Sequence, residues 1–183
     1  MRYYSSKETI SLDDEIIKKA KEFADKVVGT INYGDSNQFD LIKIANDHFI
    51  SKIGEEAAKK VFESLGKNVQ GPNYTIYEKK EKSWDADLLI DSSVEVAVKT
   101  QKKSAADRFG LSWTFQASPE RRDIILDNKD AWVVFVECND KDGSFDCTVY
   151  PPYQIKELTF GEPKLDYLKG KKKVVYATNL PII

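Results

Sequence analysis

Residues that could bind a metal ion and hydrolyse a phosphodiester lie close together in segment 84–101. This segment holds Asp87, Glu95, Lys99 and Gln101 among residues that favour β-strands. Phosphodiester hydrolysis needs a hard cation held by carboxylate oxygens, a water activated by that cation, and a positive group near the developing negative charge. Asp87 and a glutamate would hold the cation, and Lys99 would supply the positive group.

Two predicted strands must position these side chains. Ala86–Ile90 and Val94–Thr100 are rich in strand formers, and the turn-forming residues 91–93 separate them, which predicts a β-hairpin. Because side chains alternate along a strand, one face of the second strand is polar, and it consists of Glu95, Ala97, Lys99 and Gln101. The opposite face is predicted to be core and consists of Val94, Val96 and Val98. Asp87 can turn toward Lys99 if the register of the hairpin permits.

The order and spacing of these residues resemble the PD-(D/E)xK nuclease superfamily, which includes many restriction endonucleases, Holliday-junction resolvases and phage exonucleases. In that family an aspartate on one strand is followed, after a hairpin, by an acid-x-Lys triplet on the next strand. Asp87 matches the aspartate, with Ala86 in place of the usual proline. Lys99 matches the lysine, and Gln101 occupies a polar position that is often filled after it.

The sequence departs from the family pattern at Ala97, where the second acid normally stands. Three interpretations follow. Glu95 could substitute from the same strand face, roughly 6.5 to 7 Å away along the strand. A glutamate from a neighbouring helix could complete the metal site, as in variant members of the family. Alternatively, the site has lost its activity and the fold binds nucleic acid or a partner without cutting. We favour an acid that has moved to another position.

A long helix upstream could supply that acid. Apolar residues recur at helical spacing over Phe39–Leu65, and Gly66 suits the end of a helix. Asp40 could cap its start, whereas Gly54 lowers helix propensity and could kink or divide it.

Part of this segment, IGEEAAKKVFESLGKNV, resembles the Gly-Glu helix that precedes the catalytic hairpin in many of these nucleases. Glu56 aligns best with the family glutamate, and Glu55 is its immediate alternative. Taken alone, these glutamates are typical of a solvated helix face, because Lys59 and Lys60 follow four residues after each.

The fold class expected from these patterns is α/β, with a mixed central β-sheet flanked by helices, as in restriction endonucleases. With 183 residues and 41% hydrophobic residues, the chain suits a single domain, 1–183. We expect an N-terminal helix at about 12–28, a core at about 39–150 and a C-terminal extension at about 151–183. Further strands are predicted at Tyr74–Tyr77, Ala131–Cys138, Phe145–Tyr150 and Val174–Ala177.

The two cysteines fall on one predicted hairpin. If Asp142 and Gly143 form its two-residue turn, Cys138 lies directly opposite Cys147. A disulfide is geometrically conceivable, but free thiols are favoured in a reducing cytoplasm. Two cysteines and the single His48 do not favour a structural zinc site.

Charge and hydropathy limit the range of partners. A net charge of −2 and a pI of about 5.6 argue against coating nucleic acid by bulk positive charge, but do not exclude a nuclease. The candidates for contacts with a DNA backbone are Lys102, Lys103, Arg108, Arg121 and Arg122. The polar, acidic start of the chain and the lack of a long apolar run predict a cytoplasmic protein with no membrane partner.

The sequence is therefore interpreted as a Mg²⁺-dependent DNA endonuclease, with Mn²⁺ as a possible substitute. Asp87 would hold the metal, Glu56 or Glu95 would complete its coordination, and Lys99 would orient or activate water and stabilise the phosphorane. Gln101 would position water or phosphate. Asp85 is a weaker candidate for the metal aspartate, because it shares the strand face of Asp87.

The alternatives are a non-catalytic nucleic-acid-binding module and a protein-interaction module on the same fold. Cleavage of both strands would require a homodimer or a partner subunit. The sequence does not separate a restriction enzyme from a junction resolvase or a phage DNA-processing nuclease.

Overall fold

A computed structural model describes residues 2–28, 40–77, 86–140 and 145–183. Its main feature within these ranges is a seven-stranded mixed sheet. The strands are β1 (Glu8–Ser11), β2 (Val69–Gln70), β3 (Leu88–Ile90), β4 (Val94–Lys102), β6 (Trp132–Cys138), β7 (Asp146–Val149) and β8 (Tyr153–Gln154). They run in the order β1-β7-β6-β4-β3-β2, with β8 beside β6. Only β4 and β6 pair in parallel among these strands. The class is thus mixed α/β, as expected.

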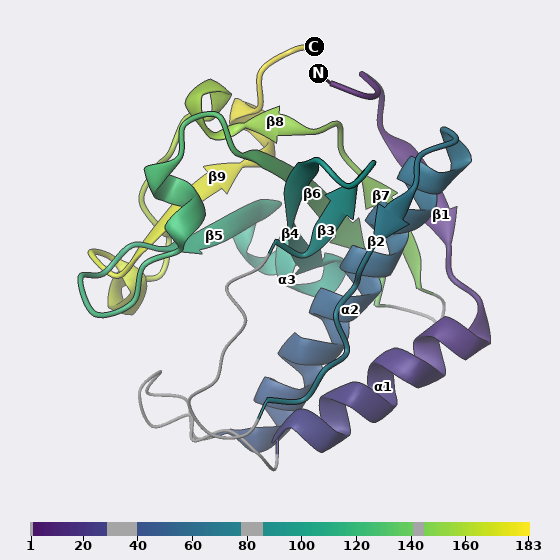
Figure 1. The fold of residues 1–183 in the computed structure, drawn as a ribbon. Coiled ribbons are helices and arrows are strands. Elements are labelled where there is room, and N and C mark those ends of the chain that lie inside the picture. Colours follow the sequence, from purple (N-terminus) through teal and green to yellow (C-terminus); the bar gives the residue numbers. More distant parts are fainter. Residues whose placement is uncertain (1, 29–39, 78–85, 141–144) are drawn as a thin grey trace.

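Three α-helices accompany the sheet in the described part of the chain: α1 (Asp14–Val28), α2 (Leu41–Ser64) and α3 (Lys103–Phe109). Short 3-10 helices lie at Ile124–Asp127, Ile155–Glu157, Asp166–Leu168 and Ala177–Asn179. Figure 1 shows α1 and α2 packed beside each other on one side of the sheet. The N-terminal helix is confirmed at nearly its predicted bounds, and the Asp13 carboxylate accepts a hydrogen bond from the Ile16 N–H at its start.

The long helix predicted upstream of the hairpin is also confirmed. Asp40 caps α2 by accepting a hydrogen bond from the Lys43 N–H at 3.0 Å. Gly66 follows the helix with a φ of 75°, a left-handed conformation that glycine adopts easily. Gly54 does not divide the segment, because α2 is continuous through it.

Two apolar cores lie on opposite sides of the central sheet. The first packs α1 and α2 against the sheet and includes Val96 and Val98 of β4, so the predicted core face of the hairpin is confirmed. The second core covers the other side and includes Trp113 and Phe115 of β5 (Ser112–Gln116). This strand pairs with β9 (Lys172–Tyr176) in a separate two-stranded sheet. The predicted polar face of β4 is therefore partly covered as well.

Three details of the sequence-based fold need correction. No strand is present at Tyr74–Tyr77, where the Tyr74 ring packs edge-on against Phe23 of α1 instead of joining a ladder. The strand predicted at Val174–Ala177 exists as β9, but it pairs with β5. Strand β1 was not predicted, because its short sequence ETIS has little apolar alternation.

The strand register predicted for the β6–β7 hairpin, which places the two cysteines opposite each other, is confirmed. Cys138 lies directly opposite Cys147, and both are buried, free thiols. The predicted turn residues Asp142 and Gly143 lie outside the described residues.

Candidate active site

The β3–β4 hairpin positions Asp87 at the open end of the ladder. Leu88 pairs with Val96, so continuing the same register places Asp87 level with Ala97. Strand β3 begins after Asp87, and the Asp87 Oδ2 accepts a hydrogen bond of 2.7 Å from the Val98 N–H. The side chain thus replaces a backbone partner at the end of β3. This fixes the carboxylate at the end of the hairpin, beside β4.

A glycine allows helix α2 to approach strand β4 closely. A Cβ atom at Gly54 would lie only 1.8 Å from the Thr100 Oγ1, so any larger residue would displace the helix or the strand. The Thr100 Oγ1 is itself buried and has no hydrogen-bond partner within the described residues. This contact brings the next helix residue, Glu55, toward the hairpin.

Glu55 is buried at the surface of α2 that faces Asp87. It is 2% exposed, and it accepts hydrogen bonds from the Ser51 hydroxyl at 3.0 Å and the Lys52 Nζ at 2.5 Å. Burial, followed by the negative charge of Asp87, raises the pKa of Glu55 to about 7, and Lys52 only partly offsets both effects. Glu55 and Asp87 are therefore electrostatic neighbours.

Glu56, the first choice from the sequence, points toward a different neighbour. Its Oε1 accepts a hydrogen bond from the Tyr74 hydroxyl at 2.9 Å and lies 4.0 Å from the Lys19 Nζ. Burial and then the charge of Glu56 raise the pKa of Tyr74. The expectation that both glutamates form a solvated face is wrong, because both are buried. The one that couples to Asp87 is Glu55.

Lys99 reaches a carboxylate that the sequence analysis did not single out. Its Nζ lies 2.7 Å from the Asp123 Oδ2 and 5.0 Å from the centre of the Phe115 ring. Asp123 also accepts a hydrogen bond from the Gln116 N–H, which ties it to the end of β5. Both partners of the ion pair are half-buried, so the lysine is held in one place.

Together these residues form what we call the Asp87 cluster, which consists of Lys52, Glu55, Asp87, Lys99 and Asp123. Burial raises the pKa of Asp87, the Val98 N–H and the two lysines lower it, and Asp123 raises it further. The cluster contains three carboxylates and two lysines, so negative charge is in excess. The pKa values of Glu55 and Asp87 are therefore both raised above their usual range.

The remaining strand residues predicted for the site lie in different surroundings. Glu95 is exposed and pairs with Leu89, on the turn side of Asp87. The Gln101 side chain accepts a hydrogen bond from the Ser112 N–H at 2.8 Å and donates one to the Gly110 carbonyl at 3.4 Å. Gln101 therefore anchors the start of β5. Asp85 lies outside the described residues.

The predicted DNA-binding residues do not form one group. Lys103 lies near Asp107 and Glu137, and Arg122 pairs with Asp127 at 2.9 Å. The Arg108 guanidinium lies over the ring of Phe109. The remaining two predicted residues, Lys102 and Arg121, carry no ion pair to a carboxylate within the described residues.

The donor set of the Asp87 cluster suits a hard cation with few protein ligands. Across the described residues, no three acidic, histidine or cysteine side chains converge on one point to hold a metal ion. Glu55 and Asp87 supply two neighbouring carboxylates. Mg²⁺ commonly takes one or two carboxylates, keeps several waters and completes its shell with substrate phosphate oxygens. The pair is therefore chemically compatible with Mg²⁺: the Asp87 Oδ2 bonds to Val98, and within the described residues the Asp87 Oδ1 accepts no hydrogen bond.

Searches of protein-family models, of curated proteins and of solved structures found no match for this chain. The described helices include none that is both long and apolar enough to span a membrane. Any assignment of function therefore rests on the residues and geometry of the site itself.

Sequence reasoning missed two members of the cluster, Lys52 and Asp123. The Lys52–Glu55 spacing of three residues is a signal for a helical ion pair, but such pairs are usually exposed. Asp123 follows Arg121 and Arg122 in a region that gave no strand or helix signal of its own. Its contact with Lys99 joins positions 24 residues apart.

Proposed function

We propose that this protein is a Mg²⁺-dependent DNA endonuclease with a restriction-endonuclease-like fold, related in its chemistry to the PD-(D/E)xK superfamily. The observation that carries the proposal is the electrostatic interaction of buried Glu55 with Asp87, together with the Lys52–Glu55 ion pair and the influence of Lys99 on Asp87. Helix glutamate, strand aspartate and strand lysine follow one another in the chain order of that superfamily. The migrated acid is Glu55 of α2, in place of the acid missing at Ala97.

Asp87 and Glu55 would hold the cation. A bound Mg²⁺ lowers the pKa of its water and neutralises charge on the phosphate. Asp87 is fixed by Val98, and Glu55 by Ser51 and Lys52, so neither carboxylate needs to be ordered when substrate arrives. Glu55 must lose its proton before it can bind a cation, so cation affinity is expected to rise as the pH passes about 7.

Lys99 would contact the reacting phosphate or its attacking water. Asp123 holds the Lys99 ammonium group at 2.7 Å and keeps it oriented. During the reaction the ammonium would donate a hydrogen bond to a phosphate oxygen as negative charge grows there. Gln101 fixes the start of β5 beside it, and its predicted contact with water or phosphate stays a prediction.

A second candidate function is a non-catalytic DNA-binding module. The Lys99–Asp123 ion pair favours it, because the lysine already has a carboxylate partner. In that case the charged cluster would contribute to DNA contacts without cleavage.

The test is cleavage of supercoiled plasmid and of branched DNA with Mg²⁺ or Mn²⁺. Asp87→Asn and Lys99→Ala should each reduce the rate by about 100-fold or more, as does removal of one group that stabilises transition-state charge in other enzymes. Asp91→Asn is the matched control, because Asp91 lies in the hairpin turn, pairs with Lys67 and is expected to matter little. If folded wild type cuts neither substrate, or if the mutants cut as fast as wild type, the proposal fails. Sedimentation of the active species would test the expected homodimer or partner subunit.

A further inference from the structure

Beyond the Asp87 cluster, the paired ends of β5 and β9 bring a second lysine close to Lys99. Gln116 pairs with Lys172 across these strands. The Gln116 N–H donates a hydrogen bond of 3.2 Å to Asp123, the residue that holds Lys99. Lys172 is half-buried, and within the described residues no carboxylate forms an ion pair with it. Lys172 thus lies at the border of the candidate active site.

A turn next to this strand end contributes an arginine. The Arg121 N–H donates to both the carbonyl and the hydroxyl oxygen of Ser118, each at 3.2 Å. Ala117 forms a bridge with Arg122, and the Ala117 N–H bonds to the Lys171 carbonyl. These contacts hold Arg121 beside the end of β9, and its side chain is exposed.

Helix α2 and strand β4 supply two more cations. The Gly54–Thr100 contact fixes the helix against the strand, and Lys102 lies two residues beyond Thr100 on β4. Partial desolvation raises the pKa of Asp47 on α2, while the charges of Lys43, Lys102 and Lys172 oppose this effect. Asp47 thus lies within reach of lysines from three different elements.

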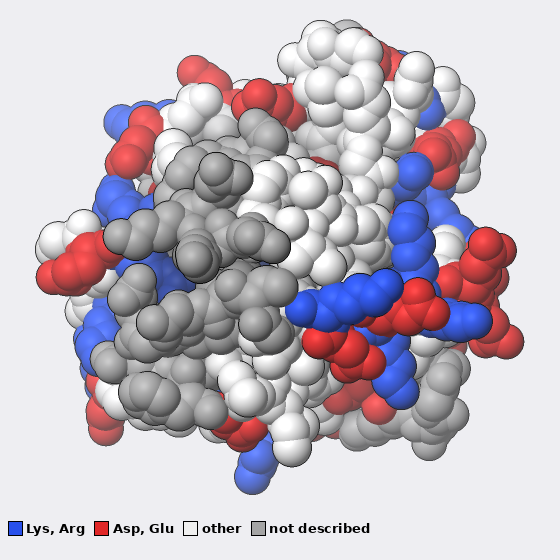
Figure 2. Space-filling view, turned by 60° about the horizontal axis from the view of Figure 1, so that its bottom comes forward, with Lys and Arg blue, Asp and Glu red and all other residues white. Residues whose placement is uncertain are grey.

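We call Lys43, Lys102, Arg121 and Lys172 the Lys172 cluster. Burial lowers the pKa of Lys172, and the positive charges of Arg121, Lys43 and Lys99 lower it further, whereas Asp47 raises it. Cations from four segments therefore influence one another here, and an excess of positive charge favours binding of an anion. Figure 2 shows basic and acidic side chains interspersed on both the left and the right of the face that it presents.

The residues next to Arg121 and Lys172 in the sequence, Arg122 and Lys173, lie in different surroundings. Lys173 is exposed and points to the opposite face of β9 from Lys172, because side chains alternate along a strand. It lines a separate pocket together with Arg122, Lys129 and Lys156. Arg122 is already paired with Asp127, whereas its neighbour Arg121 is not paired with a carboxylate within the described residues.

We propose that the Lys172 cluster binds the sugar-phosphate backbone of a DNA strand and leads it to Lys99 and Asp87. This inference rests on the proposed function for its substrate, but the binding itself does not require cleavage. A linear polyanion fits because the cations come from α2, β4, a turn and β9, and because Lys99 adjoins both clusters. Lys43 is a DNA contact that the sequence alone did not indicate.

The test is fluorescence anisotropy with a labelled DNA duplex in EDTA, where no metal-dependent cleavage occurs. The double variant Arg121→Ala/Lys172→Ala should bind at least about 10-fold more weakly than wild type. The slope of log affinity against log salt should fall by about 2, one for each lost phosphate contact. The control Lys129→Ala/Lys173→Ala removes the same charge from the separate pocket and should bind within about 2-fold of wild type. Thermal unfolding of each variant verifies that it is folded.

Equal losses in the two double variants would overturn the inference, because bulk charge would then explain binding. No loss in Arg121→Ala/Lys172→Ala would also overturn it. An RNA duplex of the same sequence is run in parallel, and tighter binding of RNA would reject DNA as the ligand. If the cluster variant alone loses binding while wild type fails to cleave, the inference holds and the proposed endonuclease activity fails.

Discussion

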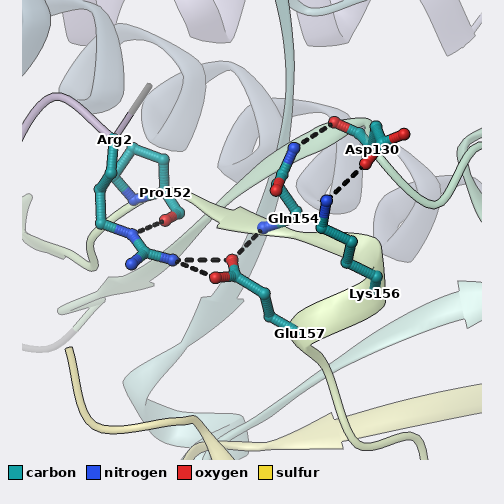
Figure 3. Close-up of polar contacts among 6 residues, drawn as sticks. All are labelled: Arg2, Asp130, Pro152, Gln154, Lys156 and Glu157. Atoms are coloured by element: carbon teal, nitrogen blue, oxygen red, sulfur yellow. Dashed lines mark hydrogen bonds and ion pairs between the residues drawn. The ribbon is translucent and has the colours of Figure 1, made fainter.

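The Asp87 cluster and the contact between Arg2 and Glu157 are both fixed by hydrogen bonds, but their charges are balanced differently. Figure 3 shows the Arg2 guanidinium bound to both Glu157 oxygens, at 2.8 and 2.7 Å, and to the Pro152 carbonyl. The Gln154 N–H also donates a hydrogen bond to the Glu157 carboxylate, at 2.7 Å. Burial would raise the pKa of Glu157, but the bonds from Gln154 and Arg2 outweigh it and lower the pKa.

The Asp87 cluster has the opposite balance. It holds more carboxylates than lysines, and the pKa values of Glu55 and Asp87 are raised. At Arg2–Glu157 the partners satisfy each other, which stabilises the N-terminal segment against the β8 region. At Asp87 the excess acid costs stability, which is common at functional sites, and the cation that we propose to bind there would offset this cost.

The largest effect that distinguishes the two regions is expected in the pH dependence of stability. The native pKa of Glu55 is about 7, above its ordinary value of 4.5, so the folded state keeps a proton that the unfolded state loses. Stability should therefore fall as the pH rises from about 4.5 through 7. Glu55→Gln has no such proton, so between pH 4.5 and 7.5 wild type should lose up to about 3 kcal/mol relative to this variant.

Urea unfolding at several pH values measures this difference. Glu55→Gln also weakens the contact with Lys52, so its absolute stability can be lower, but the change with pH is the decisive quantity. Glu63→Gln, at a half-exposed position of α2, is the control and should follow wild type. Parallel curves for wild type and Glu55→Gln would contradict the raised pKa.

The next largest effect is expected at the Arg2–Glu157 contact, where the charges balance. Arg2→Ala should lower the free energy of unfolding by about 1–3 kcal/mol, because it removes charge-assisted bonds to Glu157. Arg2→Lys keeps the positive charge but cannot form the same bidentate contact, so it should recover only part of the lost free energy of unfolding. Urea unfolding at neutral pH checks this. If Arg2→Ala is as stable as wild type but no longer cleaves DNA, the Arg2–Glu157 contact affects the Asp87 cluster and the two regions are not independent.

The smallest effect is expected where α2 meets β4. The Thr100 hydroxyl is buried without a partner in the described structure, so Thr100→Val should stabilise the protein by about 1 kcal/mol. For a chain of this size this corresponds to a rise in Tm of about 2–4 °C. Thr114→Val, at an exposed position of β5, should leave Tm nearly unchanged. A fall in Tm with Thr100→Val would mean that the hydroxyl has a partner, such as water.

Local signals in the sequence predicted many of the helices and strands. The turn at 91–93 and the valine alternation predicted the β3–β4 hairpin, and Asp40 and Gly66 marked both ends of α2. These features depend on residues that are close in sequence, and so they could be found without the fold.

The assembly of the site depended on contacts that are distant in sequence. The choice between Glu55 and Glu56 depends on which side of α2 meets the hairpin, and adjacent helix residues point about 100° apart. Gly54 was expected to weaken the helix, but its role is to let the helix approach Thr100. Asp123 meets Lys99 only because the chain returns after β5, and no periodic pattern indicates that return.

The central claim is that Glu55 and Asp87 together bind a divalent cation. Calorimetric titration of Mn²⁺ at pH 8 into wild type, Asp87→Asn, Glu55→Gln and Glu56→Gln tests it most directly. We predict that wild type and Glu56→Gln bind alike, and that Asp87→Asn and Glu55→Gln each bind at least about 10-fold more weakly. Binding that is absent in folded wild type, or unchanged in Asp87→Asn and Glu55→Gln, would contradict the account.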